Sequence, residues 1–405
     1  MKTTERFLKY ITINTQSDED SGTHPSFTGE FDLAKELVSE LKEMGITAEL
    51  DDNCYVMAKI AATSGYEDRP AIGFIAHMDT SPAYSGQNVC AIMHENYDGG
   101  DVVYPCGKVM KASEYPHLAD FKGETLITSD GTTLLGADDK AGVSEIMTAM
   151  EALLGEGRDH GRICIAFTPD EEIGEGADHF DVEKFGADYA YTVDGGDVCE
   201  IEYENFNAAD AKIEIHGLSV HPGSAKGVMI NAINVAHELH AMLPEKMRPE
   251  NTEGYEGFYH LTDISGNCDS AKLHYIVRDH DRDKFEKMKD HLRSCIDAIN
   301  CKYGEGTATL TLTDSYYNMI EKIRDHMHLI ETVKLAIKEA GMTPVEVPIR
   351  GGTDGARLSY MGLPCPNLGT GGFNFHGPFE CITKERMDRA VLVILDIIRR
   401  YAEGV

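Results

Sequence analysis

The sequence predicts an α/β fold with a smaller domain inserted into it, and two observations lead to this prediction. In the first half of the chain, short apolar runs alternate with segments of helical periodicity. From about residue 207 to residue 315 the order changes to strand, helix, two strands, helix and strand, and α/β character returns after Tyr317. We therefore expect a discontinuous main domain, 1–206 and 316–405, and an inserted domain, 207–315.

Three compact apolar runs are the expected strands of the main sheet. They are 71–76, 163–167 and 189–193. Runs that are apolar throughout are typical of strands covered on both faces, so we expect a mostly parallel sheet flanked by helices. Helical spacing of apolar residues occurs over 31–44, over 140–154, and in a final helix over about 384–402.

The inserted segment has the β-α-β-β-α-β order of a split βαβ unit. Its first strand, around 211–215, alternates apolar and polar residues with period two, which is typical of a half-exposed strand. The other expected strands are 258–264, 271–277 and 307–312, and the helices lie near 232–243 and 285–299. An exposed edge strand of this domain can pair with its mate in a second subunit, so a homodimer through this domain is a hypothesis.

Composition excludes several classes of partner and location. Asp and Glu outnumber Lys and Arg by 69 to 37, which gives a formal net charge of −32. Because such a surface repels phosphate, we expect neither nucleic acid nor an anionic membrane as partner. The apolar runs are too short to span a bilayer, the N-terminus does not resemble a signal peptide, and the ten cysteines form no CxxC motif. These features favour a cytoplasmic protein with reduced thiols.

Polar residues that suit a divalent metal follow the expected strands or begin the segments after them. They are His77 and Asp79, Asp138, Glu171 and Glu172, Asp194, and His376. In open α/β sheets, ligands bind beyond the carboxyl ends of the strands. Two imidazoles and several carboxylates without a thiolate suit a divalent ion such as zinc. The pattern therefore indicates a metal site at this edge of the sheet.

Apart from the segment of His77 and Asp79, each of these motifs also has a simpler interpretation on its own. Asp138 or Asp139 can cap the helix that follows, and the segment 170–172 can be a solvated acidic turn. Asp194 can belong to a plain turn, and His376 to a glycine-rich loop. The joint occurrence of these motifs at successive strand ends favours the metal site.

Five ordered motifs carry a resemblance to a known family. They are His77-Met78-Asp79-Thr80, 136–142 (GADDKAG), 168–172 (TPDEE), 193–196 (VDGG) and Asn374-Phe375-His376-Gly377. Together with the inserted domain they resemble the peptidase T family, tripeptide aminopeptidases of the co-catalytic zinc peptidase clan that also contains aminoacylases and carboxypeptidase G. The resemblance covers essentially the whole chain and implies a zinc-peptidase catalytic domain with an inserted lid and dimerisation domain.

The resemblance also implies a site with two Zn²⁺ ions in each subunit and a water between them. The implied ligands are His77, Asp138 and Asp194 for one ion, and Asp138, Glu172 and His376 for the other. Glu171 is implied as the general base that activates the water, and Asp79 as the carboxylate that orients His77.

Substrate contacts are nominated by the same resemblance. The nominated residues are His221, Arg278, Arg350 and Asn231, which would hold the terminal carboxylate and the carbonyl of a peptide. Arg278 equally suits a structural salt bridge with Asp279 or Asp281, and His221 precedes a Pro-Gly turn.

The expected function is hydrolysis of the N-terminal peptide bond of tripeptides in the cytoplasm, as part of peptide catabolism. Alternatives with the same chemistry are a dipeptidase, a carboxypeptidase or an N-acyl amino acid deacylase. A non-catalytic, metal-stabilised binding protein is an alternative of a different class, and it would have no need of a proton carrier such as Glu171.

Overall fold

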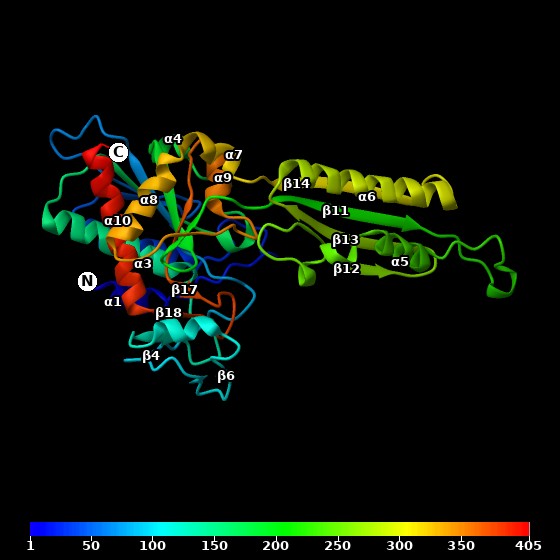
Figure 1. Ribbon diagram of the computed structural model, residues 1–405, viewed down its shortest axis with the longest axis horizontal. Helices are drawn as coiled ribbons and strands as arrows, with labels where there is room; N and C mark the ends of the chain where they lie inside the picture. The colour runs from blue at the N-terminus through cyan, green and yellow to red at the C-terminus, as the bar shows by residue number, and fades with distance from the viewer. Residues whose placement is uncertain (405) are drawn as a thin grey trace. The chain divides into compact units, whose positions relative to one another are not determined.

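The computed structural model describes residues 1–404, and the chain divides into two compact units (Figure 1). The main unit comprises Met1–Tyr203, Glu321–Val347 and Thr353–Val405, and the inserted unit comprises Glu204–Ile320 and Pro348–Gly352. The return of 348–352 to the inserted unit is a feature that the order of elements along the sequence does not reveal.

A mixed sheet of eight strands forms the centre of the main unit. Its order is β1 (Ala48–Leu50), β2 (Val56–Ile60), β8 (Ile163–Thr168), β3 (Ile72–His77), β9 (Tyr189–Gly195), β16 (Asn367–Gly369), β10 (Glu200–Glu202) and β15 (Val345–Glu346). Four of its seven pairings are parallel, and three are antiparallel. The three apolar runs are the neighbouring strands β8, β3 and β9, so the α/β prediction is confirmed.

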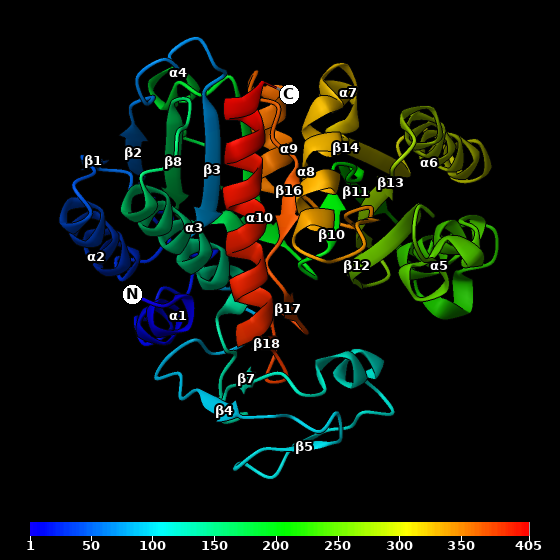
Figure 2. The same ribbon diagram turned by 60° about the vertical axis from the view of Figure 1, so that its left-hand side comes forward.

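Helices cover both faces of this sheet, and they explain why β3 is buried over its full length. The helices of the main unit are α1 (Thr3–Tyr10), α2 (Glu30–Glu43), α3 (Ala137–Glu156), α4 (Val182–Phe185), α8 (His328–Glu339), α9 (Asp354–Tyr360) and α10 (Lys384–Glu403); α7 (Ile320–Ile323) precedes α8. Figure 2 shows α3 and α10 side by side in front of the sheet. On the other face, Ile75 of β3 packs with Phe185 of α4 and Leu358 of α9.

A smaller sheet connects the segments that flank α3 and α10. Its order is β17 (Gly372–Phe373), β18 (Cys381–Thr383), β7 (Leu126–Thr128) and β4 (Ile92–His94), and a separate pair is formed by β5 (Val102–Val103) and β6 (Val109–Met110). The loop from β17 to β18 carries His376, and β18 runs directly into α10. The sequence analysis did not predict these short strands.

The inserted unit contains one antiparallel sheet with two helices packed on it. Its elements are β11 (Asn207–His216), α5 (Ala232–Met242), β12 (Phe258–Gly266), β13 (Ser270–Asp279), α6 (Arg282–Tyr303) and β14 (Ala308–Tyr316), and the strand order is β12-β13-β11-β14. Alternate residues of β11, such as Ile213 and Ile215, join Leu239 of α5 and Leu292 of α6 in one apolar core. The predicted β-α-β-β-α-β order is confirmed.

No helix within residues 1–404 combines the length and the apolar character that crossing a membrane requires.

The close approach of α3 to β9 depends on a glycine, and this gives the first prediction. A methyl group at Gly142 would lie 1.9 Å from the backbone oxygen of Val193 and 2.5 Å from Oδ1 of Asp139. Gly142→Ala must therefore push the helix away from the strand, and we expect a loss of about 3 kcal/mol in the free energy of unfolding.

Gly155→Ala is the matched control on the same helix, because nothing lies within 4 Å of the added methyl group. It should stabilise the protein by roughly 0.5–1 kcal/mol. Urea unfolding of both variants measures the difference, and equal stability of the two would contradict the packing described here.

Candidate metal centre

The residues implied as ligands come together in the main unit at the carboxyl ends of its parallel strands. His77 is the last residue of β3, and Asp194 lies near the end of β9. Glu171 and Glu172 form a short 3₁₀ turn, Glu171–Ile173, directly after β8. Since β8, β3 and β9 are parallel neighbours, their ends deliver these side chains to one edge of the sheet.

Two further residues reach this edge from loops. Asp138 precedes the regular part of α3, because the backbone at Asp138 and Asp139 is not helical and the helix proper begins at Lys140. His376 lies in the loop between β17 and β18, and its side chain is 48% exposed. The start of this helix at residue 140 matches the sequence prediction.

The carboxylate of Asp138 lies between the two histidines. Its Oδ1 is 2.9 Å from Nε2 of His77, and its Oδ2 is 2.9 Å from Nε2 of His376. His77 Nε2 is also 3.3 Å from Oδ1 of Asp194, and His376 Nε2 is 3.0 Å from Oε2 of Glu172. The potential ligand atoms thus form two groups that share Asp138.

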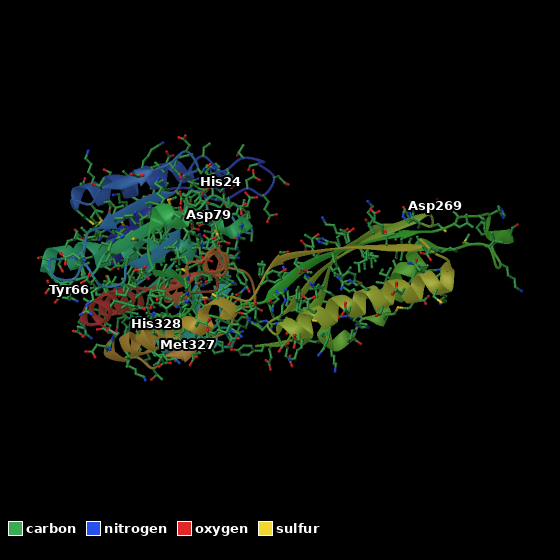
Figure 3. The ribbon with its side chains drawn as sticks, turned by 90° about the horizontal axis from the view of Figure 1, so that it is seen from above. His24, Tyr66, Asp79, Asp269, Met327 and His328 are labelled. Carbon is green, nitrogen blue, oxygen red and sulfur yellow. The ribbon has the colours of Figure 1, made fainter. Side chains whose placement is uncertain are left out.

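Asp79, marked in Figure 3, supports both groups. Its two carboxylate oxygens accept hydrogen bonds from the backbone N–H groups of Glu171 and Glu172, at 3.0 and 3.1 Å. Oδ1 of Asp79 also lies 3.2 Å from Nδ1 of His77, whose Nε2 faces Asp138. One buried carboxylate therefore fixes the histidine ring and the turn that carries both glutamates.

Glu171 lies beside the first group of ligand atoms. One of its carboxylate oxygens is within 4.8 Å of the potential ligand atoms of His77 and Asp194. The segment 170–172 is not a solvated turn, because Asp170 is buried and the Glu172 side chain is only 4% exposed. That simpler interpretation is wrong.

Two acidic residues outside the predicted ligand set hold the backbone of this site, and one of them, Glu380, was not predicted from the sequence. Glu380 accepts hydrogen bonds from the N–H groups of Leu135, Gly136 and Asp138, at 2.7, 2.9 and 3.0 Å. The only signal for Glu380 in the sequence is its place four residues after His376.

Asp139 is the second of these residues, and it caps the start of the regular part of α3. Its Oδ1 accepts the N–H of Gly142 at 3.2 Å, and its Oδ2 accepts the N–H of His77 at 3.2 Å. It therefore ties the start of α3 to the end of β3, while the neighbouring Asp138 faces the histidines.

The electrostatics of the cluster show an excess of buried negative charge. Burial raises the pKa of Glu172 to about 7 and that of Asp194 to about 6, and burial together with Asp194 raises the pKa of Glu171 well above its usual range. Hydrogen bonds to Asp138 and Glu172 raise the pKa of His376 to about 11. Burial alone would raise the pKa of Asp138, but hydrogen bonds from the two histidines lower it.

These residues fit a pair of divalent cations. Two imidazoles and three carboxylates offer nitrogen and oxygen ligands, the set that zinc accepts. Oε1 of Glu172 is buried and has no hydrogen-bond partner, so it is free to bind an ion. A pocket lined by Asp18, Ser81 and Pro82 opens beside Glu172 and His376.

The four nominated substrate residues all belong to the inserted unit, where each has local partners. Asn231 caps α5 by accepting hydrogen bonds from the N–H groups of Ile233 and Asn234. Nδ1 of His221 accepts the N–H of Gly223 at 3.1 Å, as a turn requires.

The two arginines contact backbone carbonyls and aromatic rings. Arg278 donates to the carbonyl of Val277 at 3.2 Å and lies over the ring of Tyr316. Within residues 1–404 it makes no ion pair, so the structural salt bridge considered above does not form. Arg350 donates to the carbonyl oxygens of Gly254 and Glu256, at 2.6 and 3.1 Å.

Substitution of Glu380 tests its part in positioning Asp138. Glu380→Gln replaces one acceptor oxygen by an NH₂ group that faces backbone N–H donors, so the loop that presents Asp138 must shift. We expect metal affinity to fall about 10–100-fold, as for other residues that orient ligands. Competition with a chelator measures this affinity.

The control is Glu385→Gln, because Glu385 also accepts a backbone N–H, from Thr125 at 2.7 Å, at the start of α10. Its metal affinity should stay at the wild-type value. Equal affinities for Glu380→Gln and the wild type would show that Glu380 does not position Asp138.

Known proteins match this chain over nearly its whole length. Peptidase T of Alkaliphilus oremlandii is 55% identical over 404 residues, which are 98% of this chain and 99% of the relative. The structure of the aminopeptidase PepT from Bacillus cereus has a TM-score of 0.80 at 23% identity, covering 99% of this chain and 98% of that one. The structure of a tripeptidase from Staphylococcus aureus has a TM-score of 0.79 at 21% identity, covering 100% of this chain and 98% of that one.

The inserted unit matches a family model of its own. Residues 203–306 match the peptidase dimerisation domain. The inserted domain and the family that the five motifs indicated are both confirmed. With relatives that are more than half identical over almost its full length, the chain belongs to the peptidase T family.

Proposed function

We propose that this protein is a dizinc aminopeptidase that hydrolyses the N-terminal peptide bond of tripeptides. The family supports this proposal, as does the arrangement of two ligand groups around Asp138. The proposed ligands are His77, Asp138 and Asp194 for one ion. Asp138, Glu172 and His376 are the proposed ligands of the other.

The observation that carries the proposal is the position of Glu171. Its carboxylate lies beside His77 and Asp194, and its backbone is held by Asp79. Burial and the neighbouring Asp194 raise the pKa of Glu171, and a raised pKa makes a carboxylate a stronger proton acceptor. A protein that only bound metal would have no use for such a group.

In the proposed reaction, Glu171 takes a proton from the attacking water and delivers it to the leaving amine. Asp79 keeps His77 and the turn of Glu171 and Glu172 in place during this transfer. When bound, two zinc ions would activate the water and polarise the scissile carbonyl.

Substrate contacts and assembly are part of the same proposal. His221, Arg278, Arg350 and Asn231 are proposed to contact the peptide, whose terminal carboxylate suits the arginines. A homodimer is proposed to form through the inserted unit, which matches a dimerisation domain and whose edge strand β12 carries the exposed Ile264. The proposed location is the cytoplasm.

The test of the proposal is Glu171→Gln. This variant keeps the size of the side chain but removes the base, so kcat for a tripeptide should fall about 10²–10⁴-fold while the metal content stays unchanged. Steady-state kinetics and elemental analysis of the same preparation measure both quantities. A variant that kept more than a tenth of the wild-type kcat would contradict the role of Glu171.

Glu183→Gln, an exposed position on α4, is the control and should keep the wild-type kcat. A panel of dipeptides, tripeptides, tetrapeptides and acylated amino acids tests the substrate class. Faster hydrolysis of acylated amino acids than of free tripeptides would favour the deacylase alternative.

A further inference from the structure

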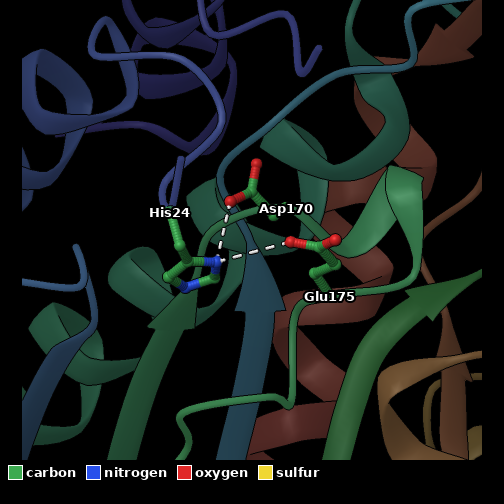
Figure 4. Close-up of side chains that lie close together, drawn as sticks. All are labelled: His24, Asp170 and Glu175. Carbon is green, nitrogen blue, oxygen red and sulfur yellow. Dashed lines mark ion pairs between the residues drawn. The ribbon is translucent and has the colours of Figure 1, made fainter. Parts of the chain in front are cut away.

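We infer that His24, Asp170 and Glu175 form a third cation site, which binds one divalent transition-metal ion such as Zn²⁺ (Figure 4). This site is separate from the two groups that share Asp138, and it contains none of their residues. The inference does not depend on the proposed peptidase activity.

The spacing of the three side chains is that of metal ligands. Nδ1 of His24 lies 3.1 Å from Oδ2 of Asp170 and 3.9 Å from Oε2 of Glu175. Ligands at about 2.0–2.1 Å around a tetrahedral zinc ion lie about 3.3 Å apart. The atoms around Asp138 are separated by 2.9–3.3 Å, so the two places have similar geometry.

The imidazole of His24 lacks the hydrogen bonds that a buried ring needs. Both of its nitrogens are buried, and neither makes a hydrogen bond. Nδ1 lies close to Asp170, but the geometry of this contact is not that of a hydrogen bond. The side chain of His24 is 12% exposed. A cation between the ring and the two carboxylates would give Nδ1 the partner it lacks.

The surroundings of the site are rich in carboxyl groups. Asp170 is fully buried, and Glu30 and Asp79 both face it. Within residues 1–404, no Lys or Arg forms an ion pair with Asp170 or Glu175, and His24 is the only basic group that contacts them. The backbone N–H of Ser26 reaches both oxygens of Asp170, which still have lone pairs for an ion.

The site is accessible, and its histidine is held in place. The side chain of Glu175 is 47% exposed, so an ion can enter from solvent past this residue. The rings of Tyr55 and His179 pack on His24, with centroids 5.8 and 4.7 Å away. Because Asp170 directly precedes the turn of Glu171 and Glu172, an ion bound here would connect the His24 loop to that turn.

The alternative is a plain contact between His24 and Asp170 that binds no ion, and counting ions distinguishes the two. The full-length protein is stripped with a chelator, titrated with Zn²⁺ at neutral pH, and analysed for tightly bound zinc. We expect His24→Asn and Glu175→Gln each to bind one equivalent less than the wild type. Identical zinc content in the wild type and both variants would overturn the inference.

Two further variants make the result specific. His274→Asn is the matched control, because His274 also lies 3.2 Å from a carboxylate, that of Asp210, but belongs to no group of three potential ligands among residues 1–404. It should bind as much zinc as the wild type, and loss of an equivalent from it would count against a site at His24. If circular dichroism shows that His24→Asn does not fold, the zinc content of Glu175→Gln is the deciding measurement, because Glu175 is half-exposed.

Asp138→Ala separates this inference from the proposed function. This variant should lose the ions of the two groups around Asp138 and keep the ion at His24. The double variant Asp138→Ala/His24→Asn should lose that ion as well. Zinc that is retained in Asp138→Ala but not in the double variant supports the third site even where the peptidase proposal fails. Equal zinc content in the single and double variants contradicts it.

Discussion

A single carboxylate placed between two histidines is the constraint on which the main unit depends. Asp138 offers one oxygen to His77 and the other to His376, and those histidines come from the end of a central strand and from a distant loop. At Asp138, in the first turn of α3, the backbone departs from helical geometry, and Glu380 accepts three hydrogen bonds from backbone N–H groups of this stretch. The β17–β18 loop, the end of β3 and the start of α3 are thus fixed relative to one another.

The burial of this much negative charge is costly, and the fold offsets the cost in two ways. Backbone N–H groups donate hydrogen bonds to the carboxyl groups of Asp79, Asp139 and Glu380, so these buried oxygens have partners. Glu172 and Asp194 face the histidines instead, which lower their pKa values, but burial outweighs this effect and raises both pKa values. Divalent cations would supply the missing positive charge, which is why the cluster is best understood as a metal centre.

Sequence alone predicted the parts of this structure that depend on strong local patterns. The apolar runs of β3, β8 and β9 identified the central strands, and the polar residues after them converge as expected because parallel neighbours share one edge. The two- and three-residue strands of the second sheet have too few residues for a periodic pattern, and the sequence analysis missed them. Glu380 and His24 were missed for another reason: their partners lie far away in the sequence, and no spacing rule links them.

Anomalous X-ray diffraction at the zinc absorption edge, from crystals of the zinc-loaded protein, tests the shared carboxylate most directly. We expect two peaks about 3.5–4 Å apart beside Asp138, separate from the peak expected at His24, with one oxygen of Asp138 on each, His77 and Asp194 around the first, and Glu172 and His376 around the second. A single peak beside Asp138, or two peaks there of which only one contacts Asp138, would contradict this account.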